Sequence, residues 1–328
     1  MDIRRVLVVA SFLGSLGGTF GSAALADDAR VHIVSPVEGQ QFAPGDRVAI
    51  VVDVAPSLRA TDGRVGLAGL GSVKGKGFSG TRFTADFVIP DYFAGPLVLR
   101  PDVWAGTTVL GPKVRINVRP PTPPKQLRAL NRYYYFSLPR THPEHLSVKG
   151  RYAKGIERDL SSSASGTTYA SSNASVVSVD REGVCTVIGN GFAVITIENG
   201  GVREFVTFVV DDPAHPSPPI DLSGQVAIRR GGLRREPNPR IVRSHYQQVT
   251  ITNTTALPLA GPLFLAVTGL PRDVIAYGGD GGGRHRLDLP DEGLGLLPGQ
   301  SVTVDLEFLN QGNAAIAYTA KVYHGVPK

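Results

Sequence analysis

Short apolar runs alternate with turn-forming residues along the chain, and residues 150–201 show this pattern most clearly. Apolar stretches at 176–177, 184–188 and 192–197 are separated by Gly, Asn, Asp and Ser. Glycine adopts positive φ without a steric penalty and Asp bonds its own backbone, so these residues favour tight turns between antiparallel strands. No helical period of 3.6 residues fits the stretch. It predicts one small β-sandwich.

Residues 29–118 show the same strand pattern. Val48, Ile50 and Val52 fall on one side of an expected strand, because successive side chains point to opposite faces. The alternation recurs at 113–118, where Lys, Arg and Asn occupy the face opposite the apolar residues. These strands predict a first β-sandwich with a solvated outer face.

Residues 220–328 begin with an arginine-rich segment and continue as further strands. Two strands are expected in the stretch from 244 to 270, joined through a Pro/Gly loop. The buried face of the next strand is expected to hold Val302, Val304, Leu306 and Phe308. The last strand is expected to turn inward Ile316, Tyr318, Ala320 and Val322.

Two proline-rich segments interrupt these strand-forming regions, at residues 119–125 and 212–219. Proline lacks the N–H that a sheet needs and restricts its predecessor to extended conformations, so both segments are expected to be semi-rigid linkers. They divide the chain into three parts of roughly 90 to 110 residues, the usual size of a β-sandwich domain.

Three motifs in the central part carry a resemblance to a known family. They are an opening with Gly150, Tyr152 and Gly155, a core at residues 169–179, and a close at residues 191–196. Together they resemble the group-2 bacterial immunoglobulin-like domain over residues 126–211. The resemblance implies an immunoglobulin-like sandwich that serves as a secreted or surface spacer or adhesive module, with no catalytic residues to carry over.

The two flanking parts resemble related modules more loosely. The opening of the first, at residues 35–52, is similar to the first strands of bacterial immunoglobulin-like repeats. The third part resembles the fibronectin-III-like modules of bacterial extracellular proteins, through the order of its strands at 249–263 and 297–302. The predicted fold class is therefore all-β, with three tandem immunoglobulin-like β-sandwich domains joined by Pro-rich linkers.

The amino terminus has the features of a secretory signal peptide. Arg4 and Arg5 precede an apolar run, and residues 24–26 form a small-residue cleavage site. A membrane span would need roughly 20 apolar residues, whereas Ser and Gly interrupt this run. We expect cleavage after Ala26, no transmembrane segment in the mature chain, and a secreted, extracellular or periplasmic protein.

The expected organisation combines these features. It is a signal peptide at 1–26, an immunoglobulin-like sandwich at 29–118, a linker at 119–125, a group-2 bacterial immunoglobulin-like domain at 126–211, a linker at 212–219, and a fibronectin-III-like sandwich at 220–328.

Cys185 is the single cysteine, so no intramolecular disulfide can form. The simplest expectation is a buried thiol on a strand. Reactive use would require a basic neighbour, and pairing between chains is the remaining alternative.

The motifs of common enzymes and metal sites are missing from the sequence, which has neither H-E-x-x-H nor G-x-S-x-G. His142 and His145 have a ligand-like spacing, but Pro143 between them prevents a helix from aligning them. Acidic residues at 27–28, 211–212 and 288–292 offer calcium ligands between domains, although turn capping explains them more simply. We expect no enzyme activity and no cofactor, with an unrecognised hydrolase site as the alternative.

One arginine-rich segment is a candidate binding surface, in a chain with net charge +6 and pI near 9.5. An anionic cell-surface glycan is the partner that such charge favours, whereas nucleic acid is not expected because the segment lacks aromatic residues for base stacking. A solvated loop in front of a strand is the simpler interpretation. The candidate residues are Arg229, Arg230, Arg234, Arg235, Arg240 and Arg243, with His245 nearby.

The aromatic run at 132–136 is a second candidate, because flat rings pack on sugar faces, yet such rings also fill a sandwich core or cover a domain junction. Together the features predict a secreted, non-catalytic bacterial structural or adhesive protein, whose partner is a cell-surface glycan or an envelope protein. Recognition of an anionic glycan through residues 229–243 is the alternative function.

Overall fold

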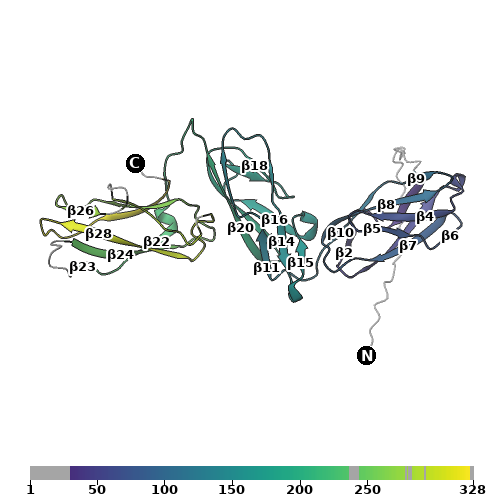
Figure 1. Ribbon diagram of the computed structural model, residues 1–328, viewed down its shortest axis with the longest axis horizontal. Coiled ribbons are helices and arrows are strands. Elements are labelled where there is room, and N and C mark those ends of the chain that lie inside the picture. Colours follow the sequence, from purple (N-terminus) through teal and green to yellow (C-terminus); the bar gives the residue numbers. More distant parts are fainter. Residues whose placement is uncertain (1–29, 236–243, 278, 280–282, 292, 326–328) are drawn as a thin grey trace, which may run out of the picture.

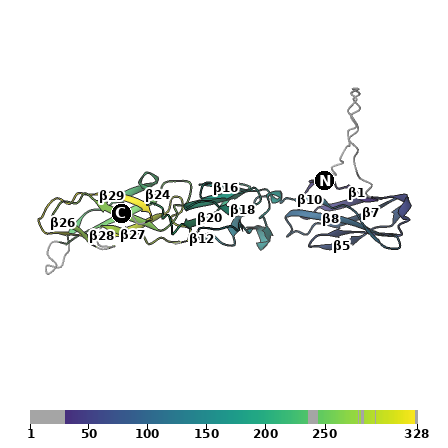
Figure 2. The same cartoon turned by 90° about the horizontal axis from the view of Figure 1, so that it is seen from above.

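The computed structural model describes residues 30–235, 244–277, 279, 283–291 and 293–325. The predicted signal peptide lies outside these residues. Three β-sandwich domains follow one another along an elongated molecule, with the central domain inclined to its neighbours in Figure 1 and all three in line when seen from above in Figure 2. The predicted fold class, tandem immunoglobulin-like sandwiches, is confirmed.

Helical structure among the described residues is confined to four short 3₁₀ turns. They are Pro56–Leu58, Ala153–Gly155, Ser163–Ser165 and Ser223–Gln225. None of the helices in the described part of the chain has the length and apolar character that membrane crossing requires.

The first domain packs two sheets face to face. One contains, in spatial order, β1 (Val31–Ser35), β3 (Arg47–Val54), β7 (Arg82–Val88) and β6 (Phe78–Ser79). The other contains β2 (Gln41–Phe42), β10 (Val114–Val118), β8 (Gly95–Trp104), β4 (Asp62–Leu67) and β5 (Gly71–Lys74), with β9 (Thr108–Leu110) also paired to β8.

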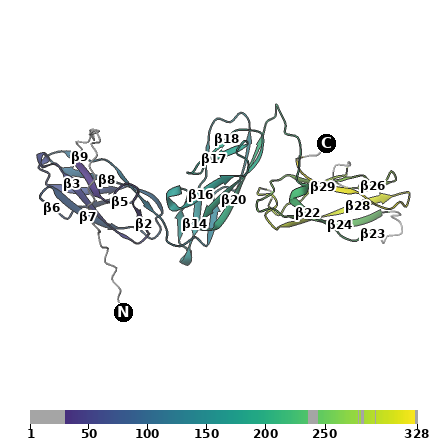
Figure 3. The same ribbon diagram turned by 180° about the vertical axis from the view of Figure 1, so that it is seen from behind.

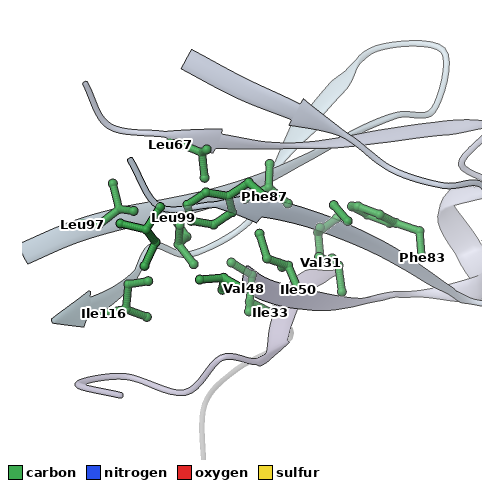
Figure 4. Packing of buried hydrophobic residues seen from close by; sticks show 14 of the residues in the cluster. Val31, Ile33, Val48, Ile50, Leu67, Phe83, Phe87, Leu97, Leu99 and Ile116 are labelled. Carbon is green, nitrogen blue, oxygen red and sulfur yellow. The ribbon is translucent and has the colours of Figure 1, made fainter. Parts of the chain in front are cut away.

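Alternation along these strands builds the core of the first domain. Val48, Ile50 and Val52 are fully buried, as their spacing predicts. They meet Leu97 and Ile116 from the opposite sheet, as Figure 4 shows for most members of this cluster. Burying such aliphatic side chains is the main favourable contribution to folding in a domain that has no disulfide.

The central domain has one larger sheet and two small ones. The larger sheet contains β12 (Tyr133–Ser137), β20 (Val202–Asp211), β19 (Gly191–Asn199) and β16 (Thr167–Ser171), with β12 parallel to β20. The small sheets contain β11 (Gln126–Ala129), β14 (Val148–Arg151) and β15 (Glu157–Asp159), and then β13 (Glu144–His145), β18 (Val184–Val187) and β17 (Val177–Val179). The turn predicted at residues 189–191 therefore carries the chain from one sheet to another.

The third domain is again a two-sheet sandwich (Figure 3). One sheet contains β21 (Ile220–Asp221), β29 (Thr319–His324), β25 (Leu263–Thr268) and β27 (Arg284–Arg286). The other contains β22 (Val226–Arg230), β24 (Ser244–Asn253), β28 (Ser301–Asn310) and β26 (Val274–Tyr277), with β23 (Arg234–Arg235) also paired to β24.

Each domain has its own cluster of buried apolar residues. The clusters fall within residues 31–118, 127–210 and 222–322. We retain the predicted limits of 29–118, 126–211 and 220–328 as a proposal for where the domains could be separated.

Candidate functional site

The arginine-rich segment lies at one edge of the third domain. Arg229 and Arg230 end β22, and Arg234 and Arg235 form β23. Both strands pair antiparallel with β24, whose edge would otherwise leave backbone groups unpaired. The expectation of a solvated loop is therefore wrong for these four residues, which are exposed but lie on strands (Figure 3).

Strand alternation places two of the arginines on the outer face of the sheet. Arg229 lies opposite Thr250, and Arg234 lies opposite Tyr246. Their partners are four residues apart on β24, so the two side chains begin about 13 Å apart along the edge. The outer face thus presents two spaced cations rather than one compact cluster.

The other two arginines point toward the opposite face. The guanidinium of Arg230 lies 4.1 Å from the centre of the Tyr318 ring, which is a cation–π contact. The Tyr318 hydroxyl donates to Oε1 of Gln247 at 2.6 Å, which orients the ring. Arg235 lies opposite His245. Arg230 therefore helps close the edge of the sandwich, which reduces its freedom to bind a ligand.

No carboxylate of the described residues pairs with any of these four arginines. Arg240 and Arg243, the remaining predicted site residues, lie outside the described residues. The candidate site is thus defined by Arg229 and Arg234, with Arg230 and Arg235 behind them.

The histidine pair and the acidic residues show no metal-binding geometry in the described part of the chain, where no three His, Cys, Asp or Glu side chains gather. His142 and His145 are exposed. Asp212 instead pairs with His215 at 3.0 Å, and this contact lowers the pKa of the Asp212 carboxyl. The carboxylates at 27–28 and 292 lie outside the described residues.

The aromatic run divides its side chains between the core and the surface, as alternation on β12 requires. Tyr134 stacks on Phe208 with ring centroids 4.7 Å apart, and Phe136 packs against the same core. Tyr133 and Tyr135 are exposed on the other face. The interpretation that some rings enter the core is correct.

Cys185 is a buried thiol on β18, as expected. Burial, with Asp180 and Glu144 nearby, raises the pKa of the thiol to about 12. A thiolate is the reactive form of cysteine, so the folded protein holds this residue in its unreactive state.

The contacts between the second and third domains were not predicted from the sequence. Thr207 and Val194 lie opposite each other on the outer face of the larger central sheet, yet they are 0% and 1% exposed. The Thr207 hydroxyl donates to the carbonyl of Leu294, which is 1% exposed, and Phe192 contacts His324 with ring centroids 4.5 Å apart. The third domain therefore covers this face.

The junction between the first and second domains is built differently. Nε of Arg158 donates to the carbonyl of Asp91 at 2.8 Å, and Ala94 packs against the central core. The linker also lies on the central domain, since a Cβ on Gly200 would approach Cβ of Pro123 to 2.6 Å. Glycine at this position lets the two segments pack closely.

With the sandwich fold and its motifs described, the central domain can be assigned to a class: it is a bacterial immunoglobulin-like domain. Residues 158–201 match the family model of the intimin immunoglobulin-like domain, which covers the middle of the central domain. No curated protein sequence matches the chain.

Several solved structures are similar to the chain at low sequence identity. The fibronectin(III)-like modules of Clostridium thermocellum CbhA are 14% identical over 57% of this chain and 97% of theirs, with a TM-score of 0.24. Domains 1–6 of the surface layer protein SbsC are 12% identical over 87% of this chain and 53% of theirs, with a TM-score of 0.23.

Proposed function

We propose that the protein is a non-catalytic extracellular rod with a structural or adhesive role at a bacterial surface. The observation that carries this proposal is the intimin-type domain held between two other sandwiches by packed junctions on both sides. Loops at the ends of such sandwiches form binding surfaces, while the sheets supply length and rigidity. Export depends on the predicted signal peptide at residues 1–26.

Deletion of the gene in the producing bacterium tests this role. We expect the deletion strain to attach less strongly to surfaces or to other cells under shear flow, and a copy encoding the full chain to restore attachment. Fractionation of the complemented strain should recover the chain outside the cytoplasm. Unchanged attachment, or recovery of the chain only from the cytoplasm, would contradict the proposal.

The exposed arginines Arg229 and Arg234 support a second candidate function, the binding of an anionic glycan. Arg229 and Arg234 point outward without a carboxylate partner among the described residues, so their charge is available to sulfate or carboxylate groups. We expect the chain from residue 27 onward to bind heparin at low salt and to lose binding as salt rises.

A double substitution separates this site from general basic charge. Arg229→Ala with Arg234→Ala should weaken heparin binding, whereas the matched pair Arg128→Ala with Arg151→Ala, exposed on the central domain, should retain it. No heparin binding at low salt rejects the second candidate.

A further inference from the structure

The far end of the first domain exposes the single tryptophan of the sequence. Trp104 ends β8 and is 52% exposed. The same strand begins at Gly95, which lies against Ser162 of the central domain. Because β8 has ten residues, Trp104 lies about 30 Å from Gly95, at the end of the first domain that is remote from this junction.

Backbone pairing fixes the position of Trp104. Its carbonyl accepts a hydrogen bond from the N–H of Thr61 at 3.0 Å, and its strand forms a tight hairpin with β9, in which Trp104 lies opposite Thr108. No described residue accepts a hydrogen bond from the indole N–H. The indole ring therefore lies on a rigid strand, and its N–H group is available to donate a hydrogen bond to solvent or to a ligand.

Polar side chains surround the ring on the same outer face. Asp62 lies directly opposite Trp104, and Asp102 precedes it by two residues on β8. Asp62 pairs with Nζ of Lys74 at 3.6 Å, and Asp102 pairs with Nε of Arg64 at 3.3 Å. Burial raises the pKa of the Asp102 carboxyl. Each carboxylate beside the ring is thus paired with a cation, and a further cation, Arg100, lies two residues before Asp102 on the same face of β8.

These features favour a sugar over a protein partner. Trp104 and Leu110 are the two large apolar side chains that this end of the face exposes. A stable protein interface usually buries about 800 Å² on each partner around an apolar centre, far more than two side chains supply. A flat indole beside paired donors and acceptors instead matches a pyranose ring, which has a C–H face and a rim of hydroxyls.

We propose that this face binds a neutral glycan of β-linked, gluco-configured sugars. Their hydroxyl groups are equatorial, so each ring offers a face of axial C–H bonds to stack on Trp104. Asp62 and Asp102 accept hydrogen bonds from the hydroxyls, and Lys74 and Arg64 donate to them. This inference deepens the proposed function, since it names the ligand class for this end of the first domain.

Intrinsic fluorescence tests the inference directly, because all tryptophan emission comes from Trp104. The chain from residue 27 onward is titrated with cellohexaose and, separately, with chitohexaose. We expect a saturable change in emission with at least one of them below about 10 mM. No saturable change with either sugar up to that concentration overturns the inference.

Calorimetry on variants identifies the site. Trp104→Ala should weaken binding at least about tenfold, and Trp104→Phe should retain part of the affinity. Tyr92→Ala removes another exposed aromatic ring, near the other end of the same domain, and should leave binding unchanged. An unchanged thermal unfolding transition shows that each variant is folded. If Trp104→Ala binds the sugar with the same affinity as the parent chain, Trp104 is not part of the binding site.

This experiment is independent of the test of the proposed function. If the sugars fail to bind while the deletion strain still loses attachment, the inference alone is wrong. If the sugars bind through Trp104 while attachment is unchanged by deletion, the adhesive role alone is wrong. Heparin serves as the charged comparison, and its binding should not depend on Trp104.

Discussion

The two domain junctions of this molecule differ in what they bury. The first relies on a hydrogen bond from the Arg158 side chain to the carbonyl of Asp91, on packing of Ala94, and on a proline-rich linker that lies on the central domain. The second covers the outer face of a sheet, where Val194 and Leu294 are almost fully buried. Opening the second junction exposes apolar surface to water, whereas opening the first mainly exchanges polar contacts for water.

This difference indicates that the second and third domains form the stiffer pair. Neither Val194 nor Leu294 belongs to the apolar core of its own domain, so their burial depends on the neighbouring domain. Bending between the first and second domains should therefore cost less free energy than bending between the second and third. At the first junction, the proline-rich linker limits the motion mainly because proline is conformationally stiff. The following predictions test this comparison.

Leu294→Asp should have the largest effect. It places a carboxylate at a buried position, with a cost of about 3 kcal/mol that separation of the two domains relieves. Small-angle X-ray scattering should show a broader distribution of distances within the molecule. Leu130→Asp, at a leucine that is 73% exposed, is the matched control and should leave scattering unchanged. Identical scattering for both variants would mean that Leu294 does not hold the junction.

Acidification should weaken the second junction and leave the first unchanged. Burial lowers the pKa of His324 below its ordinary value of 6.5, and the Ala260 carbonyl opposes this shift only partly. The unfolded state therefore binds the proton more readily, so the contribution of neutral His324 is full above pH 6.5 and is lost as pH falls below it. Thermal unfolding measured between pH 8 and about pH 5 should show this loss.

His324→Gln is the control for the pH effect, since glutamine keeps a polar side chain that does not titrate. Its stability should depend less on pH over the same range than that of the parent chain. An equal slope in both proteins would assign the dependence to another group.

Arg158→Ala should have a moderate effect, confined to the first junction. It removes the hydrogen bond to Asp91 and the contact of the guanidinium with the Tyr152 ring, 4.2 Å away, at a cost of about 1 kcal/mol. Distances between spin labels on the first and second domains should broaden. Arg151→Ala, at an exposed neighbour, should leave them unchanged. A rigid first junction in Arg158→Ala would show that the linker alone sets its geometry.

The rate at which a thiol reagent modifies Cys185 should be unchanged in both junction variants. Its thiol has a pKa of about 12 and is buried in the central core, so a thiol reagent should modify it only when that domain unfolds. Leu294→Asp and Arg158→Ala should therefore react as slowly as the parent chain in native buffer. Faster reaction in either variant would mean that its junction supports the central core as well as the domain arrangement.

The strands could be predicted from the sequence because their signal is local. Val48, Ile50 and Val52 alternate with polar or exposed positions, and each sandwich buries the apolar face that this period defines. The same reasoning places Thr207 in solvent, because it lies on the outer face of its sheet. It is buried because a loop 87 residues further along the chain covers it, and no local pattern encodes that contact.

The arginine segment shows a second limit of sequence reasoning. A run of charge indicates exposure, which is correct for Arg229 and Arg234. It does not indicate pairing with β24, which depends on an unpaired edge elsewhere in the fold, or the division of the side chains between two faces. Trp104 was missed for a related reason, since its exposure depends on where its strand ends.

The course of β8 determines how the first domain would carry a pulling force. A load applied at Trp104 enters at one end of β8 and leaves toward the linker from Val118, which lies opposite Gly95 at the other end. The two strands would slide lengthwise past each other, so their five paired positions would resist together instead of opening one at a time. This shear geometry should make the first domain resist unfolding when it is pulled between Trp104 and the linker.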